Sequence, residues 1–235
     1  MMELEKILQK EGLGTRRFCR QLIQSGKVWV ENNLCLHPTA LFSQKNLRLT
    51  VENQTFWTKE YVVLALNKPV GFECSQNAFH AGIFSLIPKR FCNRGVQPIG
   101  RLDVNTSGLI FLTDNGKLNH FLTSPKNQIP RVYVAECAEN ITEHLLIKLQ
   151  KGVFLKNEQK KSIAQHAQKL NEKTLKLTLT GGKYHEVRRM IAALGNHVVQ
   201  LKRIAYGNFQ LPENLAEGAF ELIDSSRILH HDDFK

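Results

Sequence analysis

The residues best placed to do chemistry are an arginine and an aspartate in the segment Gly100–Leu109. If the chain is extended here, Leu102 points inward, and Arg101 and Asp103 project to the same open side. A loop at the end of a strand is a common position for site residues. A guanidinium beside a carboxylate keeps the carboxylate ionised, which is the state that a nucleophile needs. The alternative is that the carboxylate only caps its own turn.

The same segment also resembles a calcium-binding loop. Asp103, Asn105, Ser107, Gly108 and Asp114 fall at positions 1, 3, 5, 6 and 12 of such a loop. However, glycines and a proline just before the segment prevent the helix that should precede it. The last position is also an aspartate, which is too short for the usual bidentate ligand. We therefore do not expect calcium, or any other metal, to bind here.

A second candidate is the basic segment Gly181–Met190, in which two glycines come directly before an expected helix. Backbone N–H groups at the start of a helix, together with Lys183 and the arginines of the first turns, can hold a phosphate. The alternative is an ordinary joint between a loop and a helix. The pattern does not decide between the two.

The net charge of +11 is concentrated in part of the chain. Residues 61–180 carry +8 and residues 181–207 carry +4, whereas the last 28 residues carry −4. A basic surface attracts polyanions, and nucleic acid is the commonest of these in a cytosol. Charge that serves only solubility is the alternative.

Composition excludes several classes of protein. The longest apolar run, residues 61–66, is far shorter than the roughly 18 residues of a membrane span. The first residues lack the apolar stretch of a secretory signal. Five cysteines without a C-x-x-C pair argue against a disulfide framework or a zinc cluster. We expect a protein of the cytoplasm with a globular core and reduced thiols.

Residues 1–57 are expected to form a small module, followed by a linker within Gln54–Glu60 that we place at 58–60. The second helix of the module, capped by Thr15, should bury the apolar residues Phe18, Cys19, Leu22 and Ile23. Its other side carries Arg16, Arg17, Arg20 and, just beyond its end, Lys27. Such a face fits RNA docking or a solvated surface equally well.

Residues 61–228 are expected to form a second domain, followed by an acidic tail at 229–235. Strands are predicted at 61–66, 109–113, 131–137 and 174–180, and helices at 117–123, 142–151 and 184–194. Helices and strands are interspersed without regular βαβ spacing. This predicts an α+β fold with a mixed or mainly antiparallel sheet.

These motifs together resemble the RsuA-type family of bacterial ribosomal RNA pseudouridine synthases. The catalytic-domain motifs are Leu66–Gly71, Gly100–Gly108 with Leu112–Gly116, and Gly182–Arg189 with Met190 and Gly195. The N-terminal module resembles an S4 RNA-binding domain through Leu4–Leu8, Gly14–Arg17 and Gly26–Val30. Within the family, Lys183–Val187 and Gly195–Val199 look closest to enzymes of the small subunit, as does Cys74-Ser75 followed by His80.

The resemblance implies that the protein isomerises a uridine of 16S rRNA and, because isomerisation needs no oxidant or energy input, that it uses no cofactor. It assigns catalytic roles to Asp103 as nucleophile, Arg188 as its charge partner and Tyr133 as the ring that stacks on uracil. Arg101 would fill the gap left by the flipped nucleotide. The cations expected to contact RNA are Arg16, Arg17, Arg20, Lys27, Lys68, Arg101, Arg131, Lys183, His185 and Arg189.

The sequence departs from the family pattern at two places. Arg131 stands where the family usually has lysine, which puts the detailed role of this cation in doubt. Glu3 and Glu5 stand where S4 modules often begin Arg-x-Asp, so one cation is lost. We expect a monomer that binds rRNA. The alternatives are the same chemistry on 23S rRNA and a non-catalytic RNA-binding assembly factor.

Overall fold

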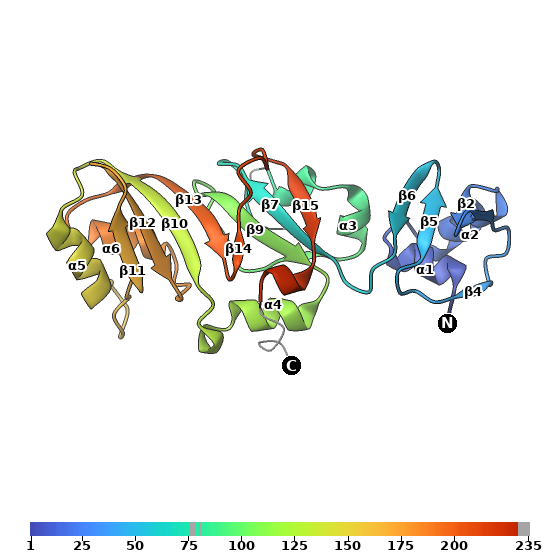
Figure 1. Cartoon of the computed structure of the whole chain (residues 1–235), viewed down its shortest axis with the longest axis horizontal. Coiled ribbons are helices and arrows are strands. Elements are labelled where there is room, and N and C mark those ends of the chain that lie inside the picture. The colour runs from blue at the N-terminus through green and yellow to red at the C-terminus, as the bar shows by residue number, and fades with distance from the viewer. Residues whose placement is uncertain (76–78, 80, 230–235) are drawn as a thin grey trace. The chain divides into compact units, whose positions relative to one another are not determined.

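The computed structural model describes residues 1–75, 79 and 81–229, and the chain divides into two compact units. Unit 1 comprises Met1–Val62 and Ile87–Gln97, and unit 2 comprises Val63–Leu86 and the chain from Pro98 onward. Figure 1 shows the ribbon and labels most of the elements of both units. Unit 1 thus includes a later segment, residues 87–97, that is separated from the rest of the unit in the sequence.

Unit 1 combines short helices with a four-stranded antiparallel sheet. The helices are α1 (Leu4–Lys10), α2 (Arg16–Gln24) and α3 (Lys89–Asn93). The sheet has the order β3 (Asn33–Leu34), β2 (Val28–Val30), β5 (Arg48–Val51) and β6 (Gln54–Trp57), and a separate pair joins β1 (Met2–Glu3) to β4 (Leu41–Phe42). Thr15 caps α2 as predicted, because its side chain accepts a hydrogen bond from the Phe18 N–H at 3.3 Å.

Two predictions for this unit are wrong. Phe18 is 45% exposed, whereas the other apolar residues of α2 are buried. Position 18 lies about 90° around the helix from the centre of the buried stripe, so its ring is at the edge of that stripe. The polar stretch Gln54–Glu60 is not a linker throughout, because its first four residues form β6, which pairs with β5 through a tight turn at Glu52 and Asn53, both with positive φ; the expected linker at 58–60 follows that strand. Such turns suit a two-residue hairpin.

Unit 2 is built on a nine-stranded sheet, visible as the long band of arrows in Figure 1. Its main order is β11 (His166–Lys169), β12 (Thr174–Leu179), β10 (Arg131–Cys137), β13 (Val198–Tyr206), β9 (Ser107–Thr113), β7 (Val63–Lys68) and β15 (Phe220–Ile223). The short strands β8 (Gln97–Pro98) and β14 (Phe209–Gln210) pair with β9 and β13. Along the main order, neighbouring strands are antiparallel except β13 and β9, which are parallel. The fold is therefore α+β with a mixed sheet, as predicted.

The helices of unit 2 pack on two apolar cores. Residues of α5 (Glu143–Lys151) and α6 (Glu186–Ala192) share one core with β10 and β12, and α4 (Gly116–Thr123) contributes to another with β7 and β9. Three turns of 3-10 helix, Ile83–Leu86, Pro125–Asn127 and Ser225–Arg227, complete the elements. Thr142 and Gly152 flank α5 as expected.

The predicted helix 184–194 begins two residues later than expected. His185 has a φ of +48°, which is a left-handed conformation that cannot continue into a helix on its N-terminal side. This backbone turn positions a side chain of the site described below. None of the helices in the described ranges is long and apolar enough to cross a membrane.

Candidate active site

A pocket of about 440 Å³ opens in unit 2 where the central motif meets the late basic segment. Its walls are residues 100–103, residues 181–188 and side chains from strands β10 and β13. The two segments singled out by the sequence are therefore adjacent in space, although about 80 residues separate them in the chain.

The loop that carries Asp103 is fixed by hydrogen bonds between the Leu102 backbone and the buried side chain of Cys74. Leu102 is buried, Arg101 is exposed and Asp103 is partly exposed, which confirms the predicted alternation. The Leu102 N–H donates to the Cys74 Sγ at 3.4 Å, and the thiol donates to the Leu102 carbonyl at 3.3 Å. The Thr106 N–H closes the turn on the Asp103 carbonyl at 3.0 Å. The Asp103 carboxylate is thus fixed on the pocket wall.

The polar partner of this carboxylate is a histidine. His185 Nε2 lies 3.3 Å from Asp103 Oδ1, with the two side chains 35% and 31% exposed. The left-handed backbone at His185 and stacking of its ring on Tyr184, with centroids 3.8 Å apart, fix the imidazole. The sequence assigned His185 to RNA contact and missed this pairing, because only the turn before α6 directs the ring to Asp103.

The side chain of Arg188 contacts the backbone of the same loop. Its guanidinium donates to the carbonyls of Asn105 and Val198, at 2.9 Å each. No ion pair joins Arg188 to Asp103 among the described residues, so its expected role as charge partner of Asp103 would act without direct contact. Burial lowers the pKa of Arg188, and the negative charge of Asp103 opposes that shift. The arginine therefore acts on the aspartate electrostatically while it holds the loop.

Two residues of β10 face the pocket in different ways. Tyr133 is partly exposed on the pocket wall, where its ring is available for stacking. Arg131 is buried and donates to the carbonyls of Leu122, Thr180 and Gly181 and to the Tyr206 hydroxyl, at 2.7–3.3 Å. Arg131 thus anchors the start of the late basic segment, with both terminal nitrogens of its guanidinium engaged within the protein.

Lys68 is fully buried, which corrects its assignment as an RNA contact. Its ammonium donates to the carbonyls of Pro69 and Phe72 at 2.9 and 2.8 Å. Burial lowers the pKa of Lys68, and the nearby Cys74 and Asp103 oppose the shift. The side chain supports the loop region from inside and does not reach the surface.

Lys183 and Arg189 are tied to a neighbouring loop. Arg189 Nη1 lies 3.2 Å and Lys183 Nζ 3.7 Å from the Glu158 carboxylate. Lys183 Nζ also donates to the Lys160 carbonyl at 2.7 Å. Both cations therefore connect residues 156–160 to the rim of the pocket, and their charges stay partly exposed there.

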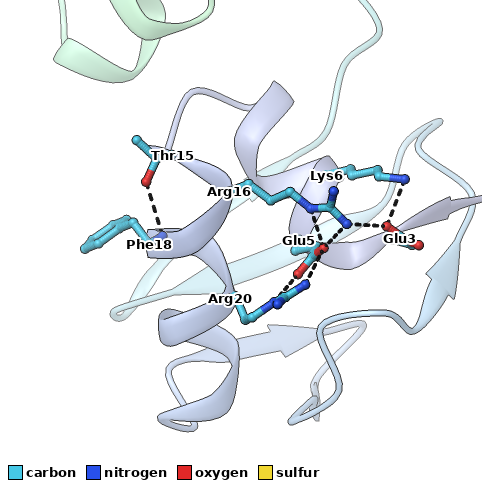
Figure 2. Close-up of polar contacts among 7 residues, drawn as sticks. All are labelled: Glu3, Glu5, Lys6, Thr15, Arg16, Phe18 and Arg20. Atoms are coloured by element: carbon cyan, nitrogen blue, oxygen red, sulfur yellow. Dashed lines mark hydrogen bonds and ion pairs between the residues drawn. The ribbon is translucent and has the colours of Figure 1, made fainter.

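In unit 1, Arg16, Arg17 and Arg20 line a shallow hollow on α2 with Gln21 and Gln24; we call these five residues the α2 face. Arg20 donates to both oxygens of the buried Glu5 at 2.8 and 3.1 Å, and Arg16 also pairs with Glu5, as Figure 2 shows. Arg20, followed by Arg16, holds the pKa of Glu5 below its ordinary value against the effect of burial. Lys27, beyond the helix, pairs with Glu52 at 2.7 Å.

Two features noted in the sequence lie outside the described residues. They are His80, which resembles the small-subunit enzymes, and positions 230–235 of the expected acidic tail.

Comparison with known proteins decides the family. The model of the RNA pseudouridylate synthase family matches residues 61–193, which include Asp103, Tyr133 and Arg188. The chain belongs to this family. Its catalytic domain thus has a pseudouridine synthase fold, as expected. A crystal structure of a pseudouridylate synthase, 30% identical, covers 97% of this chain and 98% of its own with a TM-score of 0.69.

Similar proteins in the family carry names that refer to either the small or the large ribosomal subunit. The ribosomal small subunit pseudouridine synthase A of Vibrio vulnificus is 33% identical over 97% of this chain and 98% of its own. The ribosomal large subunit pseudouridine synthase B of Buchnera aphidicola is 31% identical over 95% of this chain and 90% of its own. The likeness runs through both units in each case.

Proposed function

We propose that this pseudouridine synthase isomerises a uridine of 16S rRNA to pseudouridine, with Asp103 as the nucleophile. One observation carries the proposal. The Asp103 carboxylate stands on the wall of a pocket that also presents Tyr133 and five cationic side chains. The excess of positive charge in the pocket attracts the phosphates of RNA.

The reaction breaks the bond between uracil N1 and ribose C1′ and forms a bond between uracil C5 and C1′. Asp103 attacks either the ribose or the ring and holds the fragments together while the base turns. Tyr133 stacks on the uracil, which needs only the π face of its ring. Arg188 fixes the loop and contributes positive charge. No step requires a cofactor, since the atoms of substrate and product are the same.

Uracil within structured RNA is out of reach of this pocket, so the target nucleotide must be flipped out, at a cost of a few kcal/mol. Arg101, exposed beside Asp103, is the side chain placed to fill the gap. Lys183, which lines the pocket, and Arg189, one residue beyond the lining segment, attract the flanking phosphates. The enzyme is proposed to act as a monomer in the cytoplasm, where ribosomal subunits assemble.

The α2 face is proposed to dock RNA in the manner of an S4-like domain. Arg16, Arg17 and Arg20 are exposed side by side on one helix. The buried Glu5 carboxylate holds two of these guanidinium groups in place, so less conformational entropy is lost when a phosphate binds. Phosphate contacts of this kind set the register of the RNA and do not read its sequence.

The small subunit is favoured over the large one by the local motifs. The segments Lys183–Val187 and Gly195–Val199 resemble the small-subunit enzymes more closely. The large-subunit relative is nevertheless similar over nearly the whole chain. Modification of 23S rRNA is therefore the second candidate. A non-catalytic RNA-binding factor is the third, although it would not need Asp103, Tyr133 and Arg188 in one pocket.

Mapping of pseudouridines in rRNA from cells with and without this gene tests the proposal. The loss of one 16S site, restored by the wild-type protein but not by Asp103→Asn, is the expected result. Glu143→Gln, the same carboxylate-to-amide change at the exposed start of α5, should restore the site and serves as the control. The loss of a 23S site instead would identify 23S rRNA, and not 16S rRNA, as the substrate. Full restoration by Asp103→Asn would remove the nucleophile and favour the RNA-binding factor.

A further inference from the structure

Three buried polar groups that line the pocket have no hydrogen-bond partner in the described structure. They are Thr106 Oγ1, Arg188 Nε and Arg203 Nη2. Thr106 is 1% exposed and Arg203 is 2% exposed. More than about nine in ten buried polar groups in proteins are paired, so a cluster of unpaired ones at one site requires an explanation. A substrate that brings acceptor atoms is one.

Arg203 is held rigidly at this position. It lies on β13 opposite Tyr133 of β10 and opposite Gly108 of β9. A Cβ atom on Gly108 would lie 2.2 Å from the Arg203 carbonyl oxygen, so only glycine permits the two strands to approach this closely. The Arg203 Nε donates to the Leu109 carbonyl at 2.7 Å, and its guanidinium lies 4.9 Å from the centre of the Tyr206 ring.

The charge around Gly108 is unbalanced. Lys68, fully buried on β7, pairs with Gly108 from the other side, so two buried cations flank the strand that follows the Asp103 loop. Neither cation has a carboxylate within ion-pair distance among the residues that the structure describes. Burial of a charge without a counter-charge is costly, and proteins usually avoid it. The arrangement favours negative charge in the pocket.

The proposed reaction creates such charge. In the route in which Asp103 attacks the ribose, an ester bond forms at C1′ as the N1–C1′ bond breaks, and the electron pair of the broken bond stays with the uracil, delocalised over N1 and the carbonyl oxygens. C5 of the turned base then attacks C1′ and displaces the Asp103 carboxylate, after which C5 releases its proton to water and N1 takes up one. Fixed donors that face a developing negative charge are among the strongest catalytic devices of enzymes.

We propose that Arg203, together with the Thr106 hydroxyl, binds the carbonyl edge of the detached uracil and stabilises its negative charge. The inference rests on the proposed function. A base fits this place better than a phosphate does, because Arg203 is buried beside Tyr133, the ring proposed to stack on that base. Neither Arg203 nor Thr106 was singled out by the sequence.

The test compares RNA that carries uridine with RNA that carries 5-fluorouridine at the target position. Fluorine withdraws electrons and stabilises the detached base, so its cleavage should depend less on the protein cation. Arg203→Gln should slow isomerisation of uridine about 10²-fold under single-turnover conditions and leave RNA affinity within about twofold. Arg203→Gln should slow cleavage of the N1–C1′ bond of 5-fluorouridine much less. Thr106→Val should show the same difference between substrates at about tenfold.

Arg131→Gln is the matched comparison, since Arg131 lines the same pocket with its hydrogen bonds made to carbonyls and a hydroxyl. It should affect both substrates equally through packing. Equal slowing of both substrates by Arg203→Gln and Thr106→Val would overturn the inference. If Arg203→Gln does not fold by circular dichroism, the Thr106→Val comparison alone decides. Failure of the wild-type protein to modify any RNA would instead overturn the proposed function.

Discussion

Replacement of Gly108 by alanine should destabilise unit 2 and show how strictly the site depends on one close contact. Gly108 has a φ of +100°, and it sits where β9 meets β13. The added Cβ would lie 2.2 Å from the Arg203 carbonyl oxygen and 2.8 Å from its nitrogen. Real Cβ atoms essentially never approach a neighbouring heavy atom to less than 3.0 Å, so the strands must separate.

The size of the effect follows from two terms. A non-glycine residue in this backbone region costs about 1–3 kcal/mol. Only two residue pairs join β9 to β13, Ser107 with Lys202 and Gly108 with Arg203, so separation weakens the whole contact. Each backbone hydrogen bond lost there costs about 1 kcal/mol. We expect the free energy of unfolding of unit 2 to fall by about 3 kcal/mol or more.

Urea unfolding followed by two probes measures this. Both tryptophans, Trp29 and Trp57, lie in unit 1, so tryptophan fluorescence reports that unit, whereas circular dichroism also follows unit 2. The midpoint should shift by circular dichroism more than by fluorescence. The control is Gly116→Ala, at the exposed first residue of α4, where a Cβ meets nothing within 4 Å. It should be neutral or stabilising by up to about 1 kcal/mol.

Equal unfolding midpoints for Gly108→Ala and Gly116→Ala would refute the reasoning. That result would mean that β9 and β13 can separate without cost, and that the position of Arg203 is not fixed by Gly108.

Three further predictions concern charge and burial. Glu5→Gln should lower the free energy of unfolding of unit 1 at neutral pH. Because Arg20 lowers the pKa of the folded carboxylate, the free energies of unfolding of variant and wild type should converge as pH falls below the ordinary pKa of about 4.5. Unfolding measured across pH 3–7 tests this. Burial raises the pKa of Cys19 and Cys137 to about 11, so both should react with iodoacetamide at pH 8 more slowly than the partly exposed Cys92, as followed by mass spectrometry. His185→Leu should lower the single-turnover rate about tenfold or more and leave RNA affinity little changed. His185→Gln keeps a hydrogen-bond donor and should keep most of the rate. Equal rates for the two variants would exclude a role of His185 in positioning Asp103.

Local signals in the sequence predicted local structure well. The strand at 131–137 was predicted with its observed bounds, and Thr142 and Gly152 flank α5 as expected. These signals are carried by side chains within a few residues of the element that they cap or pattern. The inward position of Leu102 likewise followed from simple alternation.

The errors come from contacts between distant parts of the chain. The polar composition of 54–60 indicated a linker, but pairing with β5 makes its first residues a strand. The apolar Phe18 fitted a helix stripe, but tertiary packing leaves it at the edge. Residues 87–97 carry no signal that they belong to unit 1, since Arg94 reaches Glu11, 83 residues earlier, only in the folded chain.

The candidate site shows the same division. Asp103, Tyr133 and Arg188 were predicted and do share one pocket. Arg203 and Lys68 could not be recognised as buried cations, because a lysine or an arginine on a strand most often faces solvent. Only the register, which sets both beside Gly108, brings them beneath the Asp103 loop.

The burial of these cations also changes how attraction of RNA must be explained. Five cationic side chains line the pocket against two carboxylates, Asp103 and Glu186. Several of the five donate their hydrogen bonds to backbone carbonyls, as Arg131 and Arg188 do. A carbonyl satisfies the donor but does not neutralise the charge, and the low-dielectric surroundings screen that charge less than water does. The cations therefore build the walls of the pocket and attract phosphate at the same time, so a direct contact with RNA is not required of each.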